Sequence, residues 1–309
     1  MVDQPEPDLA TRVGSIVLPN PLMTASGTAG HGAELAGYVD LAALGAVVVK
    51  SLSAEPWAGN PAPRLHEATA GMVNSVGLQG PGVEAWLEHE LPALARTGAR
   101  VVASIWGHTV DDFARAAAML AGAPAAVIAV EVNVSCPNLE DRRRMFAHSA
   151  SATQEAVDAT KACGLPRWAK LSPNVHDIVE IADAAARGGA EAVTLVNTLL
   201  AIAIDAETRR PVLGAVRGGL SGPAMKPVAL RAVYDCHEAL PDLPVIGVGG
   251  VTSAPDVVEF LLAGACAVQV GTASFADPRT LDRLRVELAQ WCWQHGVRSI
   301  TELIGGAHG

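Results

Sequence analysis

Eight short runs of mostly apolar, often β-branched residues recur along the chain and alternate with stretches of helical periodicity. Gly, Ser or Asn bounds these runs, as is typical of the turns between secondary-structure elements. The predicted strands cover residues 22–26, 46–51, 101–106, 129–136, 168–172, 192–197, 245–249 and 267–271. Continuous apolar strands that alternate with helices favour a parallel sheet that is covered by helices.

Helical periodicity is clear in residues 178–186 and 228–236, where apolar side chains recur three and four positions apart. Ser253, followed by Ala-Pro-Asp, predicts the start of a further helix, and Gly264 predicts its end. Eight strand–helix repeats over about 250 residues favour a closed (β/α)8 barrel, the TIM barrel. An open doubly wound sheet is the alternative, but the G-x-G-x-x-G turn typical of it does not follow the first predicted strand.

The chain has 309 residues, half of them hydrophobic, and no linker or low-complexity segment divides it. We expect one domain over residues 1–309, with roughly ten flexible residues at the amino end. A net charge of −10 argues against a nucleic-acid partner. The amino end lacks signal-peptide features, and the longest uncharged apolar stretch, 116–130, is shorter than the roughly 20 residues that cross a bilayer. We therefore expect a cytoplasmic protein without a membrane partner.

The numbers and positions of the cysteines and lysines limit the kinds of site that this chain can form. The five cysteines are odd in number and contain no C-x-x-C pair, so they predict neither a disulfide framework nor a metal site. The chain has only four lysines, and two of them, Lys50 and Lys170, end predicted strands. Because a buried ammonium group needs a polar partner, a ligand at these strand ends would supply one.

The carboxyl ends of the predicted strands are rich in polar residues and glycines, and active sites of TIM barrels lie at this face. These residues are Ser26, Lys50, Ser51, Asn133, Cys136, Lys170, Ser172, Asn197, Thr198, Gly249, Gly250, Gly271 and Thr272. Glycines after the last two strands would let backbone amides approach a phosphate closely. A further glycine-rich stretch, 217–222, is expected to close over the same ligand. The residues alone therefore predict a barrel that binds a phosphate-bearing cofactor.

Taken in order, the motifs resemble the dihydroorotate dehydrogenases, and within that family the class that works with an iron–sulfur flavoprotein subunit. The similar segments are 20–27, 50–51, 59–64, 74–79, 133–138, 170–174, 197–200, 218–222, 247–250 and 271–272. They extend over about residues 15 to 275, and a set of this size is more specific than any one of its members.

The resemblance implies that the protein oxidises dihydroorotate to orotate in pyrimidine biosynthesis with FMN as cofactor. A base removes the proton from C5 of the substrate while the hydride on C6 passes to N5 of the flavin. The implied base is Cys136, whose thiol would reach the thiolate near neutral pH in electropositive surroundings. The other cysteines, 163, 236, 266 and 292, are expected to be inert and buried.

The resemblance also implies two sets of ligand contacts. The implied flavin contacts are Ser26, Lys50, Ser51, Ser104, Asn133, Lys170, Val196, Gly222, Gly249, Gly250, Gly271 and Thr272, and the last four bind the phosphate. The implied substrate contacts are Lys50, Asn74, Ser75, Val76, Gly77, Leu78, Asn133, Asn138, Asn197 and Thr198. Lys170 would stabilise the charge of the reduced flavin near N1 and O2. Ser104 stands where the family usually has Asn, so this residue would offer a shorter, single-point hydrogen bond.

The electron acceptor stays open at this point. The resemblance favours NAD, reached through a partner subunit that carries FAD and a 2Fe–2S cluster, because this chain has no cysteine cluster of its own. It also implies a homodimer or a heterotetramer. Fumarate as acceptor, a flavin-free phosphate-binding barrel enzyme and a flavin-binding sensor are the alternatives. The basic run 142–144 is either a solvated charge run or part of a lid for substrate or partner.

Overall fold

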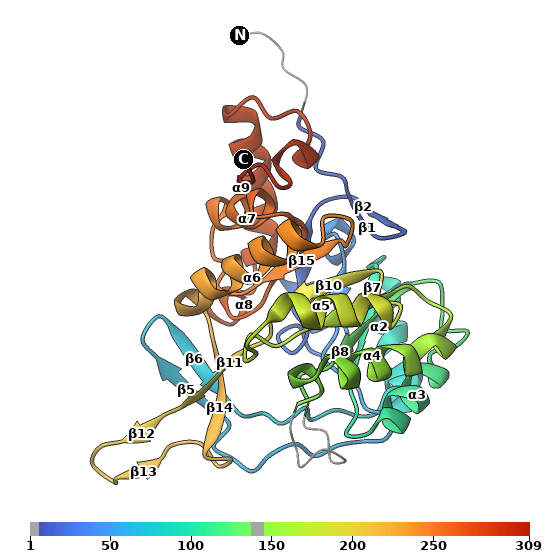
Figure 1. Ribbon diagram of the computed structural model, residues 1–309, viewed down its shortest axis with the longest axis vertical. Helices are drawn as coiled ribbons and strands as arrows, with labels where there is room; N and C mark the ends of the chain where they lie inside the picture. The colour runs from blue at the N-terminus through green and yellow to red at the C-terminus, as the bar shows by residue number, and fades with distance from the viewer. Residues whose placement is uncertain (1–5, 137–144) are drawn as a thin grey trace.

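The computed structural model describes residues 6–136 and 145–309, and it confirms the predicted (β/α)8 barrel (Figure 1). Eight parallel strands form one sheet in the order β3-β16-β15-β10-β9-β8-β7-β4. A parallel bridge between Met23 and Ala46 brings β3 against β4 and closes the ring. The strands are β3 (Leu22–Thr24), β4 (Val47–Val48), β7 (Val101–Ile105), β8 (Val127–Asn133), β9 (Arg167–Lys170), β10 (Ala192–Leu195), β15 (Val245–Val248) and β16 (Ala265–Val270). Each of them overlaps its predicted range.

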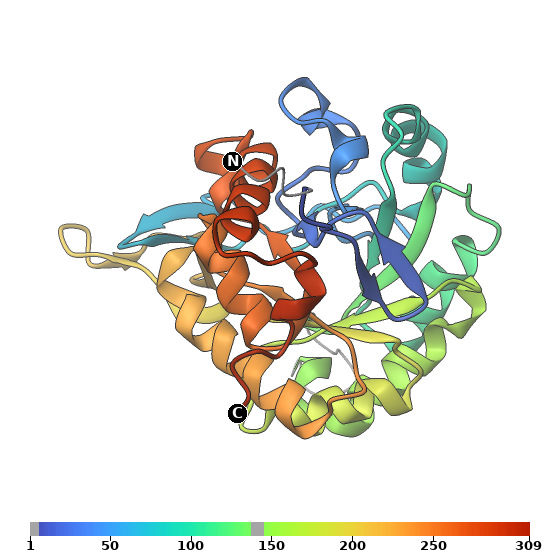
Figure 2. The ribbon, with the colours of Figure 1, turned by 90° about the horizontal axis from the view of Figure 1, so that it is seen from above.

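Helices surround the strands, as the view from above shows (Figure 2). They are α1 (Val83–Ala85), α2 (Leu91–Arg96), α3 (Val110–Met119), α4 (Ala150–Ala159), α5 (Ile178–Arg187), α6 (Lys226–Ala239), α7 (Ala254–Leu262), α8 (Ala273–Ala276) and α9 (Thr280–Gln294). A π-helical turn, Trp86–Glu90, joins α1 to α2, and short 3₁₀ turns lie at Glu34–Gly37, Leu41–Ala43, Phe146–His148, Thr160–Cys163, Pro223–Met225 and Ile300–Leu303. The helices predicted at 178–186, 228–236 and after Ser253 are confirmed. Within the described residues, no helix is long and apolar enough to cross a membrane.

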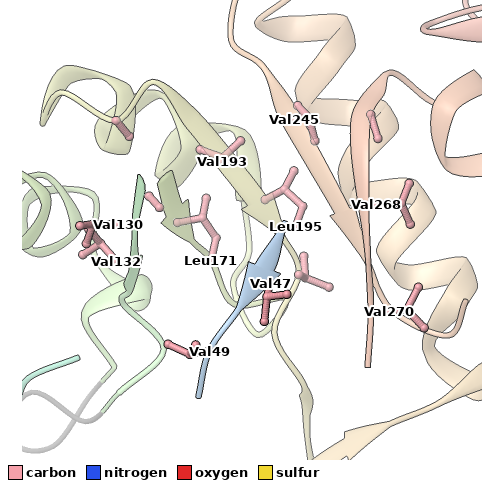
Figure 3. Packing of buried hydrophobic residues seen from close by; sticks show 14 of the residues in the cluster. Val47, Val49, Val130, Val132, Leu171, Val193, Leu195, Val245, Val268 and Val270 are labelled. Atoms are coloured by element: carbon pink, nitrogen blue, oxygen red, sulfur yellow. The ribbon is translucent and has the colours of Figure 1, made fainter. Parts of the chain in front are cut away.

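Side chains of the barrel strands alternate between two apolar clusters, as the pleat of a strand requires. One cluster packs between the strands and the helices and includes Val130 and Val132 of β8 and Val268 and Val270 of β16 (Figure 3). The other contains the alternate residues, such as Ala129, and it lies inside the barrel. Both faces of each strand are therefore buried, which explains why the strands read as continuous apolar runs.

A hairpin of β1 (Thr11–Val13) and β2 (Ile16–Leu18) covers the amino-terminal end of the barrel. Val13 and Leu18 pack into the inner cluster beside Trp168, and the Thr11 hydroxyl donates to the Cys266 carbonyl at 2.7 Å. The apolar inner cluster and this hairpin close one end of the barrel. Among the described residues, the cavity that could admit a ligand lies at the opposite end, at the carboxyl ends of the strands.

A four-stranded antiparallel sheet projects from the barrel and was not predicted (Figure 1). Its order is β11 (Leu199–Ile202), β14 (Arg217–Ser221), β6 (Gly71–Asn74) and β5 (Leu65–Ala68), and the small pair β12 (Ile204–Asp205) and β13 (Arg210–Pro211) extends it. The glycine-rich stretch that was expected to be a closing loop is strand β14. Its glycines are needed for close packing, because a Cβ at Gly219 would lie 2.0 Å from Thr198 Oγ1.

Asp256 in the first turn of α7 fixes the loop that follows β15. Its carboxylate accepts the amide hydrogens of Thr252 and Ser253, both at 2.9 Å, and the Lys226 ammonium at 2.6 Å. Burial raises the pKa of Asp256, but the hydrogen bonds from Lys226, Thr252 and Ser253 outweigh it and lower that pKa to about 2. The loop 249–253 is thereby held against α6 and α7.

Replacing Asp256 by Asn is expected to lower the free energy of unfolding by about 1–2 kcal/mol at neutral pH. Because the folded-state pKa lies below the ordinary value of 3.8, the stabilisation is full above that value and is lost as pH falls toward 2. The difference in melting temperature between the two proteins should be constant from pH 7 to 5 and should shrink below pH 4. Glu259→Gln, which removes the more exposed partner of Lys226, is the control with a small effect. A difference that does not vary with pH would contradict this account.

Candidate active site

A cavity of about 750 Å³ opens at the carboxyl ends of the barrel strands, and the antiparallel sheet borders it. This volume lies in the range of cofactor and ligand sites. Its lining includes the predicted residues Ser26, Lys50, Ser51, Asn74, Ser75, Val76, Gly77, Leu78, Asn133, Lys170, Val196, Asn197, Thr198, Gly222, Gly249, Gly250, Gly271 and Thr272. Ser104 and Cys136 do not line it, and Asn138 and the basic run 142–144 lie outside the described residues.

One end of the cavity is a glycine cradle, formed by Gly222, Gly249, Gly250 and Gly271 with Thr272 beside them. Gly222, Gly249 and Gly250 have φ values of +102°, +141° and +77°, which side chains rarely allow. A Cβ at Gly250 would lie 2.8 Å from Lys226 Cβ. Within the described residues, the amides of Gly250, Gly271 and Thr272 have no hydrogen-bond acceptor. Free amides in a concave turn of this kind fit a phosphate group.

Lys170 at the end of β9 is almost fully buried and faces the cavity. Its ammonium donates to Gln269 Oε1 at 3.0 Å and to Ser26 Oγ at 3.2 Å, and it lies 3.8 Å from Glu131 Oε1. Burial is the larger effect and lowers the pKa of Lys170 overall, although the charge of Glu131 opposes it. The amine of Lys170 therefore lies in the cavity wall, with a buried carboxylate behind it.

Lys50, after β4, has no hydrogen bond or ion pair to any described residue through its ammonium, although most of the side chain is buried. Burial lowers its pKa, and the nearby Arg64 guanidinium lowers it further. An ammonium group with no partner in a cavity favours an anionic ligand. This arrangement fits the expectation from the sequence that a ligand is the partner of this lysine.

Side-chain amides and hydroxyls form a connected chain along the cavity floor. Asn197 Nδ2 donates to Asn133 Oδ1 at 3.3 Å, and Asn133 Nδ2 donates to Ser51 Oγ at 3.2 Å. Ser104 is fully buried below them, with its hydroxyl 2.8 Å from that of Ser51. Its short side chain therefore reaches the cavity only through Ser51, which differs from the direct contact that the resemblance implied.

Cys136 is fully buried behind the cavity wall. Its thiol donates to the carbonyl oxygens of Gly107 at 2.9 Å and Asn133 at 3.3 Å. Burial raises the pKa of this thiol to about 12. Among the residues that the structure describes, the hydrogen-bond partners of the sulfur are carbonyl oxygens, which do not supply the positive charge that would favour a thiolate. The other four cysteines are free and buried, as expected.

Three aromatic rings that the sequence reasoning missed form one side of the cavity. Trp106 packs edge-to-face against Trp57 and His108, with ring centroids 5.9 and 4.8 Å apart. All three residues line the cavity, and Gly107, the acceptor of the Cys136 thiol proton, lies between two of them in the chain. Their signal in the sequence was the Trp-Gly-His segment directly after a strand.

Comparison with known proteins agrees with this geometry. The family model described as Dihydroorotate dehydrogenase matches residues 8–291. A relative from Desulforudis audaxviator is 50% identical over 303 residues, which is 97% of either chain. A relative from Geobacter sp. strain M21 is 48% identical over 300 residues, 97% of this chain and 98% of its own length. Both are named dihydroorotate dehydrogenase B (NAD(+)), catalytic subunit. This chain belongs to the dihydroorotate dehydrogenase family.

Proposed function

We propose that this protein is the catalytic subunit of an NAD-linked dihydroorotate dehydrogenase, which oxidises (S)-dihydroorotate to orotate in pyrimidine biosynthesis. The observation that carries the proposal is one cavity that joins a phosphate-fitting glycine cradle to the ammonium of Lys50, which bonds to none of the described residues. The names of the relatives support it. A flavin-free barrel enzyme would not need the second cation, Lys170, in the same wall.

The proposed cofactor is FMN, with its phosphate in the glycine cradle and its ring beside Ser26 and Lys170. When bound, FMN supplies the acceptor for the hydride that leaves C6 of the substrate. Lys170 contributes a fixed positive charge, and the Ser51–Ser104 hydroxyl pair orients Asn133 next to it. The remaining flavin contacts proposed from the sequence, among them Val196, line the same cavity.

The proposed substrate is a planar anion whose ring presents amide donors and acceptors. Asn74, Asn133 and Asn197 offer side-chain amides in fixed directions, since Asn74 donates to Gly219 and the other two bond to each other. Lys50 would pair with the substrate carboxylate. Cys136 would take the C5 proton as a thiolate, which requires that it first release its S–H proton to solvent and that its side chain rotate away from Gly107 toward the substrate.

The name "catalytic subunit" in the relatives implies a second subunit in those proteins. For this chain we propose a partner that carries FAD and a 2Fe–2S cluster and reduces NAD, in a heterotetramer built on a homodimer. Exposed apolar side chains on β11, Leu200 and Ile202, and on β12, Ile204, offer surface for assembly. A cytoplasmic location stays a prediction, and no observation favours fumarate as acceptor.

The proposal is tested with purified, FMN-reconstituted protein under anaerobic conditions. Addition of dihydroorotate should bleach the flavin absorbance and should yield one orotate per flavin. A protein that binds no FMN would favour the flavin-free enzyme, and a flavin that dihydroorotate does not reduce would favour the sensor. Steady-state assays with the co-purified partner should then give turnover with NAD, whereas rapid turnover of the isolated chain with fumarate would contradict the partner.

A further inference from the structure

Glu131 is a fully buried carboxylate in the barrel interior that the sequence reasoning did not identify. It lies on β8, two residues before Asn133, at a position that faces inward. Its Oε2 accepts from Gln269 Nε2 at 2.7 Å and from Thr194 Oγ1 at 3.3 Å. Its Oε1 has no hydrogen bond within the described residues and lies 3.8 Å from the Lys170 ammonium. Such a buried charge is costly unless a partner compensates for it.

Gln269 on β16 connects the two charged groups. Its amide NH₂ donates to Glu131, and its amide oxygen accepts from Lys170. Because donor and acceptor are both used, the amide has one orientation, and it holds the ammonium in a fixed direction. Lys170 donates two of its three N–H groups to Gln269 and Ser26. The 3.8 Å between Lys170 Nζ and Glu131 Oε1 is too long for a hydrogen bond. One N–H is left for a ligand in the cavity.

We propose that Glu131 is a positioning residue which, through Gln269 and through its own charge, keeps Lys170 an ammonium ion directed at the flavin. The inference rests on the proposed function, since it requires a flavin in this cavity. The competing account is that Glu131 and Gln269 only fill the barrel interior and stabilise the fold.

The two accounts predict different numbers of protons that the protein binds when the flavin is reduced. The described groups in contact with Lys170 are Glu131 on β8, Gln269 on β16 and Ser26 after β3, and only Glu131 is charged. Burial lowers the pKa of Lys170, and Glu131 opposes that effect. Loss of this negative charge should lower the pKa of Lys170 further, which favours the neutral amine beside the uncharged oxidised flavin. Reduction places negative charge on the flavin ring, so the amine would then bind a proton.

The experiment is the midpoint potential of FMN-loaded protein, measured against pH between 7 and 9 by spectroelectrochemistry. With Glu131 keeping Lys170 charged, as we propose, the unchanged protein should bind about one proton per two electrons. In Glu131→Gln, which keeps the shape and removes the charge, reduction should bind about one further proton. The slope of potential against pH should therefore double. The double variant Glu131→Gln with Lys170→Met should return to the single slope, because the group that binds the extra proton is gone.

Thr194→Val is the matched control, since it removes a hydrogen bond to Glu131 and keeps both charges; its slope should be that of the unchanged protein. If Glu131→Gln does not fold, Glu131→Met, which also removes the charge, replaces it and should also give the steeper slope. Equal slopes in the unchanged protein and the Glu131 variant, with FMN bound to both, would overturn the inference alone. An unchanged protein that does not bind FMN would instead overturn the proposed function.

Discussion

Replacing Cys136 by Ser should leave FMN bound but slow its reduction by dihydroorotate by about 10²–10⁴-fold at neutral pH. The reason is that an alcohol is a far weaker acid than a thiol, so the variant has almost no anionic base to accept the C5 proton. Cys136 does not line the cavity, so the flavin contacts should survive. Anaerobic stopped-flow measurement of flavin bleaching gives the rate constant directly, and the flavin content of the purified variant gives the binding.

The pH dependence of this reduction follows from burial of the thiol. Because burial raises the pKa of Cys136 to about 12, the thiolate fraction, and with it the rate constant, should rise about tenfold per pH unit below that value. The Ser variant should recover activity only at still higher pH. Cys163→Ser, at another buried cysteine, is the control and should reduce at the normal rate. Normal rates in Cys136→Ser would rule out Cys136 as the base.

Replacing Gly250 by Val should weaken FMN binding by more than about 100-fold. The added Cβ would lie 2.8 Å from Lys226 Cβ and 3.0 Å from the Gly222 carbonyl oxygen, and the φ of +77° is strained for any side chain. The backbone amide that the phosphate would meet must therefore move. Titration of apoprotein with FMN, followed by quenching of flavin fluorescence, measures the dissociation constant.

Gly122→Val is the control for Gly250→Val, because it introduces the same backbone strain without changing the glycine cradle. Gly122 has a similar φ of +78°, but a Cβ there would meet nothing within 4 Å, and the residue lies away from the cavity. Both variants should unfold at lower temperature, whereas only Gly250→Val should lose FMN affinity. Equal affinity in the two variants would mean that the glycine cradle does not hold the phosphate.

The barrel could be predicted from the sequence because both faces of each strand are buried. Continuous apolar runs such as 46–49 then differ sharply from the amphipathic helices between them. The antiparallel sheet could not be predicted in this way. Its strands are partly exposed, and β14 contains Gly218 and Gly219, which lack the side chains that produce an alternating pattern. Close packing against Thr198 is visible only in three dimensions.

The site was predictable where a polar residue ended a strand, as Lys50, Asn133 and Lys170 do. Glu131 and Gln269 lie inside apolar strands, so the search for polar residues at strand ends did not identify them. The pKa of Cys136 depends on burial and on the carbonyl of Gly107, which no sequence pattern specifies. In each case the missing information is the tertiary environment of a single side chain.

The cavity is built from two parts of different origin. Gly249, Gly250, Gly271 and Lys170 belong to the barrel, whereas Leu65, Met72 and β14, which Gly222 of the cradle follows, belong to the antiparallel sheet, whose strands come from segments more than a hundred residues apart. On the proposed function, a directed-evolution library confined to Leu65, Met72 and Asn74 would vary the surface expected to face the substrate and would leave the cradle unchanged. The architecture makes substrate range and cofactor retention separable targets for engineering.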